Sequence, residues 1–311
     1  MKEHEPTYSE IIAPEDYNRI ITDEHLYIAA SDRVIQRFIE EEVRDNAATE
    51  VVEVGCGPAR IIEKMGAIDG INLTGVDHDP QFLAYAQKII KDTRIKLVLT
   101  EMADYQHGKP VDVFYSQGTH HHILKGTATD AYLQNVYNQL KAGGAYIIGD
   151  EFLPEYTDEN DRHLKAVIWY SHIIANGKKH GYGFLAQEEA KTLLDDLNEG
   201  TGGEGIKSPE QITLVLNRVE AINDAAMSDD LPKAHQLAVD FLAELRAAGP
   251  AVKQSDPTMD LSRGDYKICE SALKREVEPF GFVVEKSKAV GPIGKVGAMV
   301  VYKLRKPTTI K

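Results

Sequence analysis

The stretch Val51-Val52-Glu53-Val54-Gly55-Cys56-Gly57-Pro58-Ala59 decides the fold of this chain. A β-branched run ends in two closely spaced glycines, and a helical pattern with apolar residues at 61, 62 and 65 follows it. The next strand pattern, residues 71–76, ends at Asp77. In an open α/β sheet such a strand-to-helix turn presents main-chain N–H groups to a ligand. The turn therefore predicts a binding site at the carboxyl edge of a sheet.

Strand and helix patterns continue to alternate beyond this turn. Strands are predicted at 95–99, 111–115 and 145–149, and helices at 82–90 and 130–140. Strands that alternate with helices of this length imply parallel pairing and right-handed crossovers. Residues 151–262 instead show helical segments alone, and two strand patterns return at 282–287 and 297–304 across a short connection that favours antiparallel pairing. The fold class is therefore α/β, with a helical insertion that interrupts one sheet.

These patterns divide the chain into four parts. We expect an N-terminal helical segment (1–47), the first part of the core (48–152), a helical insertion that roofs the site as a lid (153–262), and a completion of the core by one helix and two antiparallel strands (263–311).

Composition narrows the class of protein. The chain of 311 residues carries 35 Lys and Arg against 49 Asp and Glu, a formal charge of −14, and it has no basic stripe, so we expect no nucleic-acid partner. It has no apolar run of about 18 residues and no secretory signal pattern, so we expect no membrane contact and a cytoplasmic location. The two cysteines show no CxxC spacing. The oligomeric state is left open, a homodimer included.

The surroundings of the glycine turn indicate which nucleoside it binds. Asp77 follows Gly57 by twenty positions, where a carboxylate can accept hydrogen bonds from both hydroxyls of a ribose. Position 60 is arginine where a dinucleotide turn has its last glycine, and Glu53 would face a pyrophosphate unfavourably but suits an ammonium group. The pattern favours a nucleoside that bears an amino acid.

With these residues the chain resembles the class I, Rossmann-like S-adenosylmethionine-dependent methyltransferases, over residues 48–152 and 265–304. The resemblance implies a seven-stranded sheet with an antiparallel last strand, and S-adenosylmethionine as cofactor. The residues that it assigns to the cofactor are Glu53, Gly55, Gly57, Asp77, Ala103, Asp104 and Ser116. Ala59 stands where many members have glycine. An N-P-P-Y motif is absent, which argues against methylation of nucleobase or glutamine nitrogens.

Three consecutive histidines, His120, His121 and His122, follow the predicted fourth strand, where the family places the methyl group of the cofactor. Three interpretations compete for them. One of them is a general base or orients the acceptor, or the cluster is structural, or His120 and His122 ligate a metal with help from a residue such as Asp150. Metal ligation is the least favoured, because consecutive side chains cannot all converge on one ion.

Further polar residues are candidates for binding the methyl acceptor: Asp150 and Glu151 after the fifth strand, and Tyr170 and His172 in the first inserted helix. We expect methyl transfer to a small-molecule metabolite, such as an amine or a keto or hydroxy acid. One alternative is transfer of the aminobutyl group of the same cofactor, as in nicotianamine-like synthases. Another is a nucleoside-binding interaction protein without turnover.

Overall fold

The core of the protein is a single seven-stranded sheet in the order β3-β2-β1-β4-β5-β7-β6. The computed structural model describes residues 9, 12–43, 48–123, 127–198, 208–248, 266–292 and 296–308. The strands are β1 (Thr49–Val54), β2 (Ile71–Asp77), β3 (Lys96–Leu99), β4 (Val111–Gln117), β5 (Leu140–Phe152), β6 (Val283–Val290) and β7 (Ala298–Arg305). Strands β1 to β5 pair in parallel, and β7 is antiparallel to both of its neighbours. The predicted α/β class and seven-stranded sheet are confirmed.

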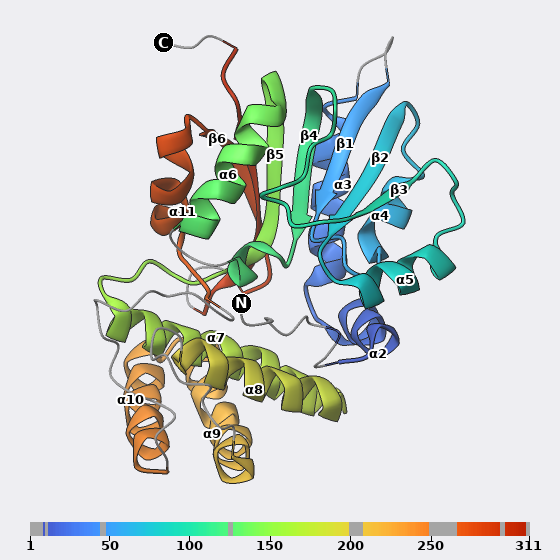
Figure 1. Ribbon diagram of the computed structural model, residues 1–311. Helices are drawn as coiled ribbons and strands as arrows, with labels where there is room; N and C mark the ends of the chain where they lie inside the picture. Colours follow the sequence, from blue (N-terminus) through green and yellow to red (C-terminus); the bar gives the residue numbers. More distant parts are fainter. Residues whose placement is uncertain are drawn as a thin grey trace, which may run out of the picture.

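Helices cover both faces of the sheet (Figure 1). They are α3 (Ile28–Glu40), α4 (Arg60–Met65) and α5 (Pro80–Ile89) on one side, and α6 (Thr127–Gln139) and α11 (Glu270–Val277) on the other. Neighbouring residues of a strand point to opposite faces. Val51 accordingly packs in the apolar cluster of α3 and α4, and Val52 packs in the cluster of α6 and α11. Burial on both faces explains why the valines at 51, 52 and 54 lie on both sides of β1.

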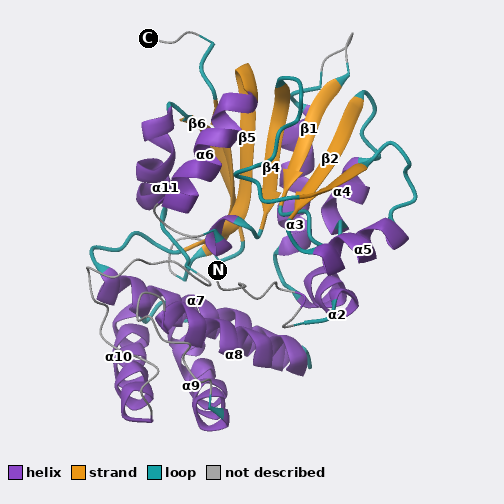
Figure 2. Ribbon diagram, in the orientation of Figure 1, coloured by secondary structure: helices purple, strands orange, loops and turns teal. Residues whose placement is uncertain are grey.

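The insertion folds as four helices with an apolar core of their own. They are α7 (Glu159–Lys179), α8 (Gly183–Asn198), α9 (Pro209–Met227) and α10 (Leu231–Ala248). A capping box of Ser208 and Gln211 begins α9, as its sequence predicts. The four helices lie beyond the carboxyl ends of the parallel strands, as the secondary-structure colouring makes plain (Figure 2). The inserted helices therefore lie where the sequence analysis expects a roof over the site. That they move as a lid stays a prediction. The predicted boundary at 262/263 lies outside the described residues, as does residue 47.

The N-terminal segment is helical only in pieces. After α2 (Pro14–Arg19) the chain widens into a π-helical turn, η1 (Ile20–Glu24), and leaves the helix before α3 begins. The predicted N-terminal helical segment is thus broken at His25 and Tyr27 in the structure. Because of this break, the side chains of His25 and Tyr27 reach buried polar partners, which are described below. A continuous helix would direct these two side chains elsewhere.

Two further segments differ from the sequence prediction. Strand β5 continues to Phe152, because β7 supplies partners for Asp150 and Glu151 through Val300 and Met299. The helix predicted from residue 266 begins only at Glu270, since the preceding residues run extended and Ile268 forms a bridge with Phe152. Both differences add extended backbone at the carboxyl end of β5, where Asp150 and Glu151 lie.

Within the described residues, no helix combines the length and the apolar character that a bilayer crossing requires.

Candidate active site

The turn after β1 is shaped by two glycines with positive φ, Gly55 at 66° and Gly57 at 49°. A Cβ on Gly55 would lie 2.5 Å from Cγ2 of Thr119, so this glycine permits the loop after β4 to approach the turn closely. No atom of the described residues lies within 4 Å of the corresponding position on Gly57. The backbone of Gly57 therefore faces open space. Ala59 also has a positive φ, 63°, a conformation that costs a non-glycine residue about 1–2 kcal/mol.

Asp77 is tied to the glycine turn by its side chain. Its Oδ2 accepts from the N–H of Gly57 at 2.7 Å, and its Oδ1 accepts from the N–H of Asp79 at 2.8 Å. Burial raises the pKa of Asp77, and these two N–H groups offset part of that rise. Each carboxylate oxygen retains a second lone pair, which a ribose hydroxyl can use. The open face of Gly57 and the adjacent carboxylate fit the nucleoside that the sequence predicts.

Two other predicted cofactor residues are enclosed by protein. Glu53 is 1% exposed, and its carboxyl accepts a hydrogen bond from the hydroxyl of Tyr115 at 3.0 Å. Burial raises the pKa of Glu53 well above its ordinary value, which favours the neutral acid. The hydroxyl of Ser116 is buried beside the hydroxyl of Tyr146 at 3.2 Å. In the arrangement described, neither side chain faces solvent, and contact of either with the cofactor stays a prediction.

The predicted adenine-reading pair, Ala103 and Asp104, lies in the loop that follows β3. Both residues are exposed, and the N–H of Asp104 donates to the carbonyl of Glu101 at 3.1 Å. Strand β3 pairs with β2 in parallel, so this loop begins at the same edge of the sheet as Asp77. The position suits the predicted role without testing it.

The three histidines form a short 3-10 turn, η2 (His120–His122), in which the side chain of His120 binds a different partner from that of His121. Both oxygens of Asp150 bind His121: Oδ1 lies 2.5 Å from ring Nδ1, and Oδ2 accepts from the main-chain N–H at 3.1 Å. His121 outweighs the effect of burial and lowers the pKa of Asp150. His120 is buried and turns toward α11, where its Nε2 lies 2.9 Å from Glu276. The ring of His122 lies against that of His121, with centroids 3.8 Å apart.

A second polar group surrounds Glu151, on the strand residue next to Asp150. Lys267 places its Nζ 2.8 Å from Oε2 of Glu151 and donates to the hydroxyl of Tyr170 at 2.5 Å. On the other oxygen, Nε2 of His25 lies 3.4 Å from Oε1 of Glu151. Burial would raise the pKa of Glu151, but the ammonium of Lys267 and the imidazole of His25 outweigh it and hold that pKa well below its ordinary value. Glu151 is therefore ionised at neutral pH.

The insertion meets the N-terminal segment at His172. Its Nε2 lies 2.6 Å from the hydroxyl of Tyr27 and its Nδ1 lies 3.0 Å from Oδ1 of Asn223 on α9. The ring of Tyr27 stacks on that of His172, with centroids 5.9 Å apart and planes 10° apart, and on Trp169. Burial lowers the pKa of His172. Two residues of α7 were predicted to bind the methyl acceptor. Tyr170 belongs to the polar group around Glu151, and His172 connects the inserted helices to the N-terminal segment.

Sequence reasoning missed His25, Tyr27, Lys267 and Asn223. No local pattern marks them, because their partners lie far away in the sequence.

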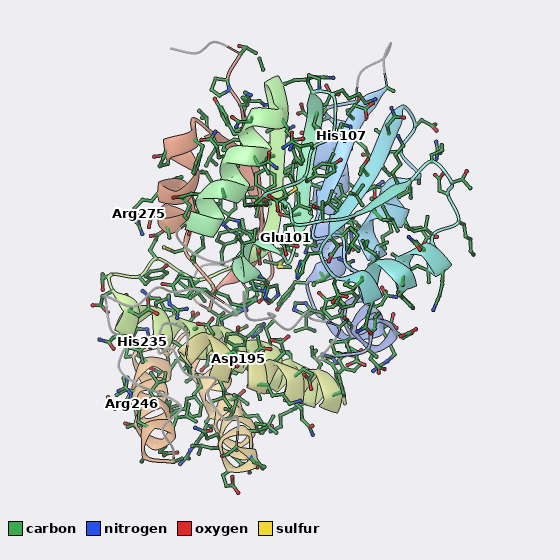
Figure 3. The ribbon with its side chains drawn as sticks, in the orientation of Figure 1. Glu101, His107, Asp195, His235, Arg246 and Arg275 are labelled. Atoms are coloured by element: carbon green, nitrogen blue, oxygen red, sulfur yellow. The ribbon has the colours of Figure 1, made fainter. Side chains whose placement is uncertain are left out.

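Other histidines lie elsewhere: His107 binds Glu50 at the start of β1, at the end of the sheet remote from the insertion, and His235 lies on α10 (Figure 3). Within the part of the chain that the structure describes, no group of three or more His, Cys, Asp or Glu is placed to hold a metal ion. His120 and Asp150, two of the residues considered for a metal, face different partners.

Comparison with known proteins agrees with this geometry. A family described as methyltransferase domain matches residues 51–144, which span the glycine turn, Asp77 and the histidines. A solved S-adenosylmethionine-dependent methyltransferase from Clostridium acetobutylicum is 10% identical, with a TM-score of 0.52, over 94% of this chain and 97% of that one. Another from Methanosarcina mazei is 13% identical, with a TM-score of 0.47, over 88% and 98%. A search of curated proteins finds no match. The family match identifies residues 51–144 as a methyltransferase domain, and the structure from Clostridium acetobutylicum shares the fold of this chain.

Proposed function

We propose that the enzyme methylates a small-molecule acceptor and that His121 is its general base. The observation that carries this proposal is the pair of His121 and Asp150 at the carboxyl ends of β4 and β5, beneath the inserted helices. An enclosed roof of this kind suits a small molecule better than a polymer. Bound S-adenosylmethionine supplies an electrophilic methyl group, which Gly55, Gly57, Asp77 and Asp104 would position.

The chemistry of His121 follows from its contacts. Asp150 binds Nδ1, which holds the hydrogen of the neutral imidazole on that atom and makes Nε2 the atom that can accept a proton. Methyl transfer would break the bond between the sulfur and the methyl group and release S-adenosylhomocysteine. Nε2 of His121 would take the proton that the acceptor loses, and the ionised Asp150 would stabilise the resulting imidazolium. His121 is therefore a proton acceptor whose orientation and charge are both set by one buried carboxylate.

The first test is transfer of a labelled methyl group from S-adenosylmethionine to a small-molecule extract of the source cells. The replacement His121→Ala is expected to lower turnover by about 10² to 10⁴-fold and to leave the affinity for S-adenosylhomocysteine unchanged, because the imidazole acts on the acceptor. His180→Ala, at an exposed position after α7, is the matched control.

Product analysis separates methyl transfer from aminobutyl transfer. S-Adenosylhomocysteine is the expected by-product, and methylthioadenosine in its place would contradict methyl transfer. Full turnover by His121→Ala would remove the base from the proposal.

A further inference from the structure

We propose that the acceptor carries a protonated amine and that this amine binds Glu151, in an amine subsite formed by His25, Glu151, Tyr170 and Lys267. The inference rests on the proposed methyl transfer and specifies the chemical class of its acceptor.

The amine subsite adjoins the proposed base. The N–H of Tyr266 donates to the carbonyl of His121 at 3.0 Å, and Ile268 forms a bridge with Phe152 at the end of β5. Lys267 lies between these two contacts, and its side chain meets Glu151. The segment thus joins the histidine turn to the subsite.

Two buried polar atoms of the subsite lack a hydrogen bond. Within the described residues, Oε1 of Glu151 and Nδ1 of His25 have no hydrogen-bond partner, although the two side chains are only 9% and 4% exposed. Buried polar atoms are almost always hydrogen-bonded, because an unmet group loses its hydration without compensation. Oε1 of Glu151 can only accept, and Nδ1 of His25 accepts in the tautomer that carries the hydrogen on Nε2. They therefore match a ligand that is rich in donors.

The charges of Asp150, Glu151 and Lys267 favour a ligand whose hydrogen-bond donor is positively charged. Asp150 and Glu151 are both ionised, and Lys267 is the ammonium group that contacts Glu151. Among the described residues, and apart from the imidazoles of His25 and His121, two adjacent carboxylates face one ammonium, and a buried charge without a counter-charge is strongly unfavourable. An alkylammonium group has three donors, no acceptor and one positive charge. It balances the charge and meets both acceptors, whereas a carboxylate or phosphate would add to the negative excess.

The test uses the whole enzyme and a cell extract. The small molecules are separated by cation and anion exchange at neutral pH, and each fraction is incubated with S-adenosylmethionine carrying a labelled methyl group. We expect the label to enter the fraction that the cation exchanger retains. Transfer only to the anionic or unretained fractions would overturn the amine subsite and leave methyl transfer standing. No transfer from the unfractionated extract would overturn both proposals.

A pair of variants tests the assigned residue. Glu151→Gln keeps the shape and removes the charge, and we expect it to raise the KM of the cationic acceptor by about 10- to 100-fold, the range for a hydrogen bond to a charged group. Affinity for S-adenosylhomocysteine should not change. If the unpaired Lys267 prevents folding, the double variant Glu151→Gln/Lys267→Met removes both buried charges, and the same rise in KM is expected. An unchanged KM in a folded variant would overturn the assignment.

Discussion

Carboxyl groups of the same residue type differ in pKa in this protein, and the surroundings of each group determine the direction of the shift. Burial raises the pKa of Glu53, and the hydrogen bond from Tyr115 offsets only part of that rise, whereas the ammonium of Lys267 lowers the pKa of Glu151 despite its burial. Asp77 accepts from two main-chain N–H groups, one of which belongs to Gly57 in the glycine turn. Residue type and spacing were enough to place Asp77 beside the glycine turn, and its contact with the cofactor stays a prediction. The states of the two glutamates depend on residues that only the fold brings near.

The role of Asp77 is open to direct measurement. Asp77→Ala should weaken binding of S-adenosylhomocysteine by about 1–3 kcal/mol, because it removes an acceptor for the ribose and leaves the N–H of Gly57 without its partner. Titration calorimetry measures this loss. Asp69→Ala, an exposed position just before β2, should bind normally. Equal affinity in the two variants would exclude Asp77 from the cofactor site.

At the scale of elements, the inserted helices are attached to the sheet through buried polar contacts. Arg162 on α7 is fully buried, and it donates to Glu159 at 2.6 Å and to Asp196 on α8 at 2.5 Å. Its guanidinium also lies over the ring of Tyr266, the residue that binds the histidine turn. The helices themselves were predictable from their apolar spacing, but this contact was not, since it joins residues more than 100 positions apart.

Loss of Arg162 should weaken the whole fold. Arg162→Ala leaves the buried carboxylate of Asp196 without its counter-charge, and breaking a buried pair in this way costs about 3–5 kcal/mol. Urea denaturation measures the free energy of unfolding. The exposed pair of Arg218 and Glu244 offers a control in the same insertion, and Arg218→Ala should lose less than about 1 kcal/mol. Equal losses would show that Arg162 is not an important stabilising contact.

The contact between α7 and the N-terminal segment should depend on pH. Burial holds the pKa of His172 below its ordinary 6.5, so the unfolded chain takes up a proton that the folded protein resists. The stabilising contribution is complete above about pH 6.5 and is lost as pH falls through the lower folded pKa. A neutral imidazole can accept from Tyr27 and donate to Asn223, and protonation removes the acceptor.

The variant His172→Gln retains one donor and one acceptor but does not titrate. We expect its unfolding free energy to change less between pH 7 and pH 5 than that of the unaltered protein. His180→Gln, at an exposed position, should keep the original pH dependence. If both variants followed the same curve as the unaltered protein, His172 would not be the titrating group.

At the scale of the whole molecule, alternation of strand and helix patterns was sufficient to predict one sheet interrupted by a helical insertion. The glycine turn located the carboxyl edge where the site lies. The pattern could not place β7 between β5 and β6, because pairing order depends on long-range contacts and not on period. It also could not bring His25 and Lys267 together, which enter the site from opposite ends of the chain.

The charge of the whole chain predicts its behaviour toward nucleic acids. With a formal charge of −14, the protein should not form a tight complex with RNA or DNA, since phosphate contacts need a concentration of Lys and Arg. Filter binding at low salt measures this. A submicromolar complex that weakens steeply with added salt would refute the expectation.

The position of β7 has a consequence for synthesis on the ribosome. It is the last of the seven strands along the chain, yet it lies between β5 and β6 and pairs with Asp150 and Glu151. Until about residue 305 has left the exit tunnel, β5 presents an open hydrogen-bonding edge to other nascent chains. The two carboxylates also lack the strand that fixes their backbone. A growing chain can therefore form its glycine turn early, whereas the groups around Asp150 and Glu151 take their places only when the final strand pairs with β5. Chaperone contact is most needed in that interval.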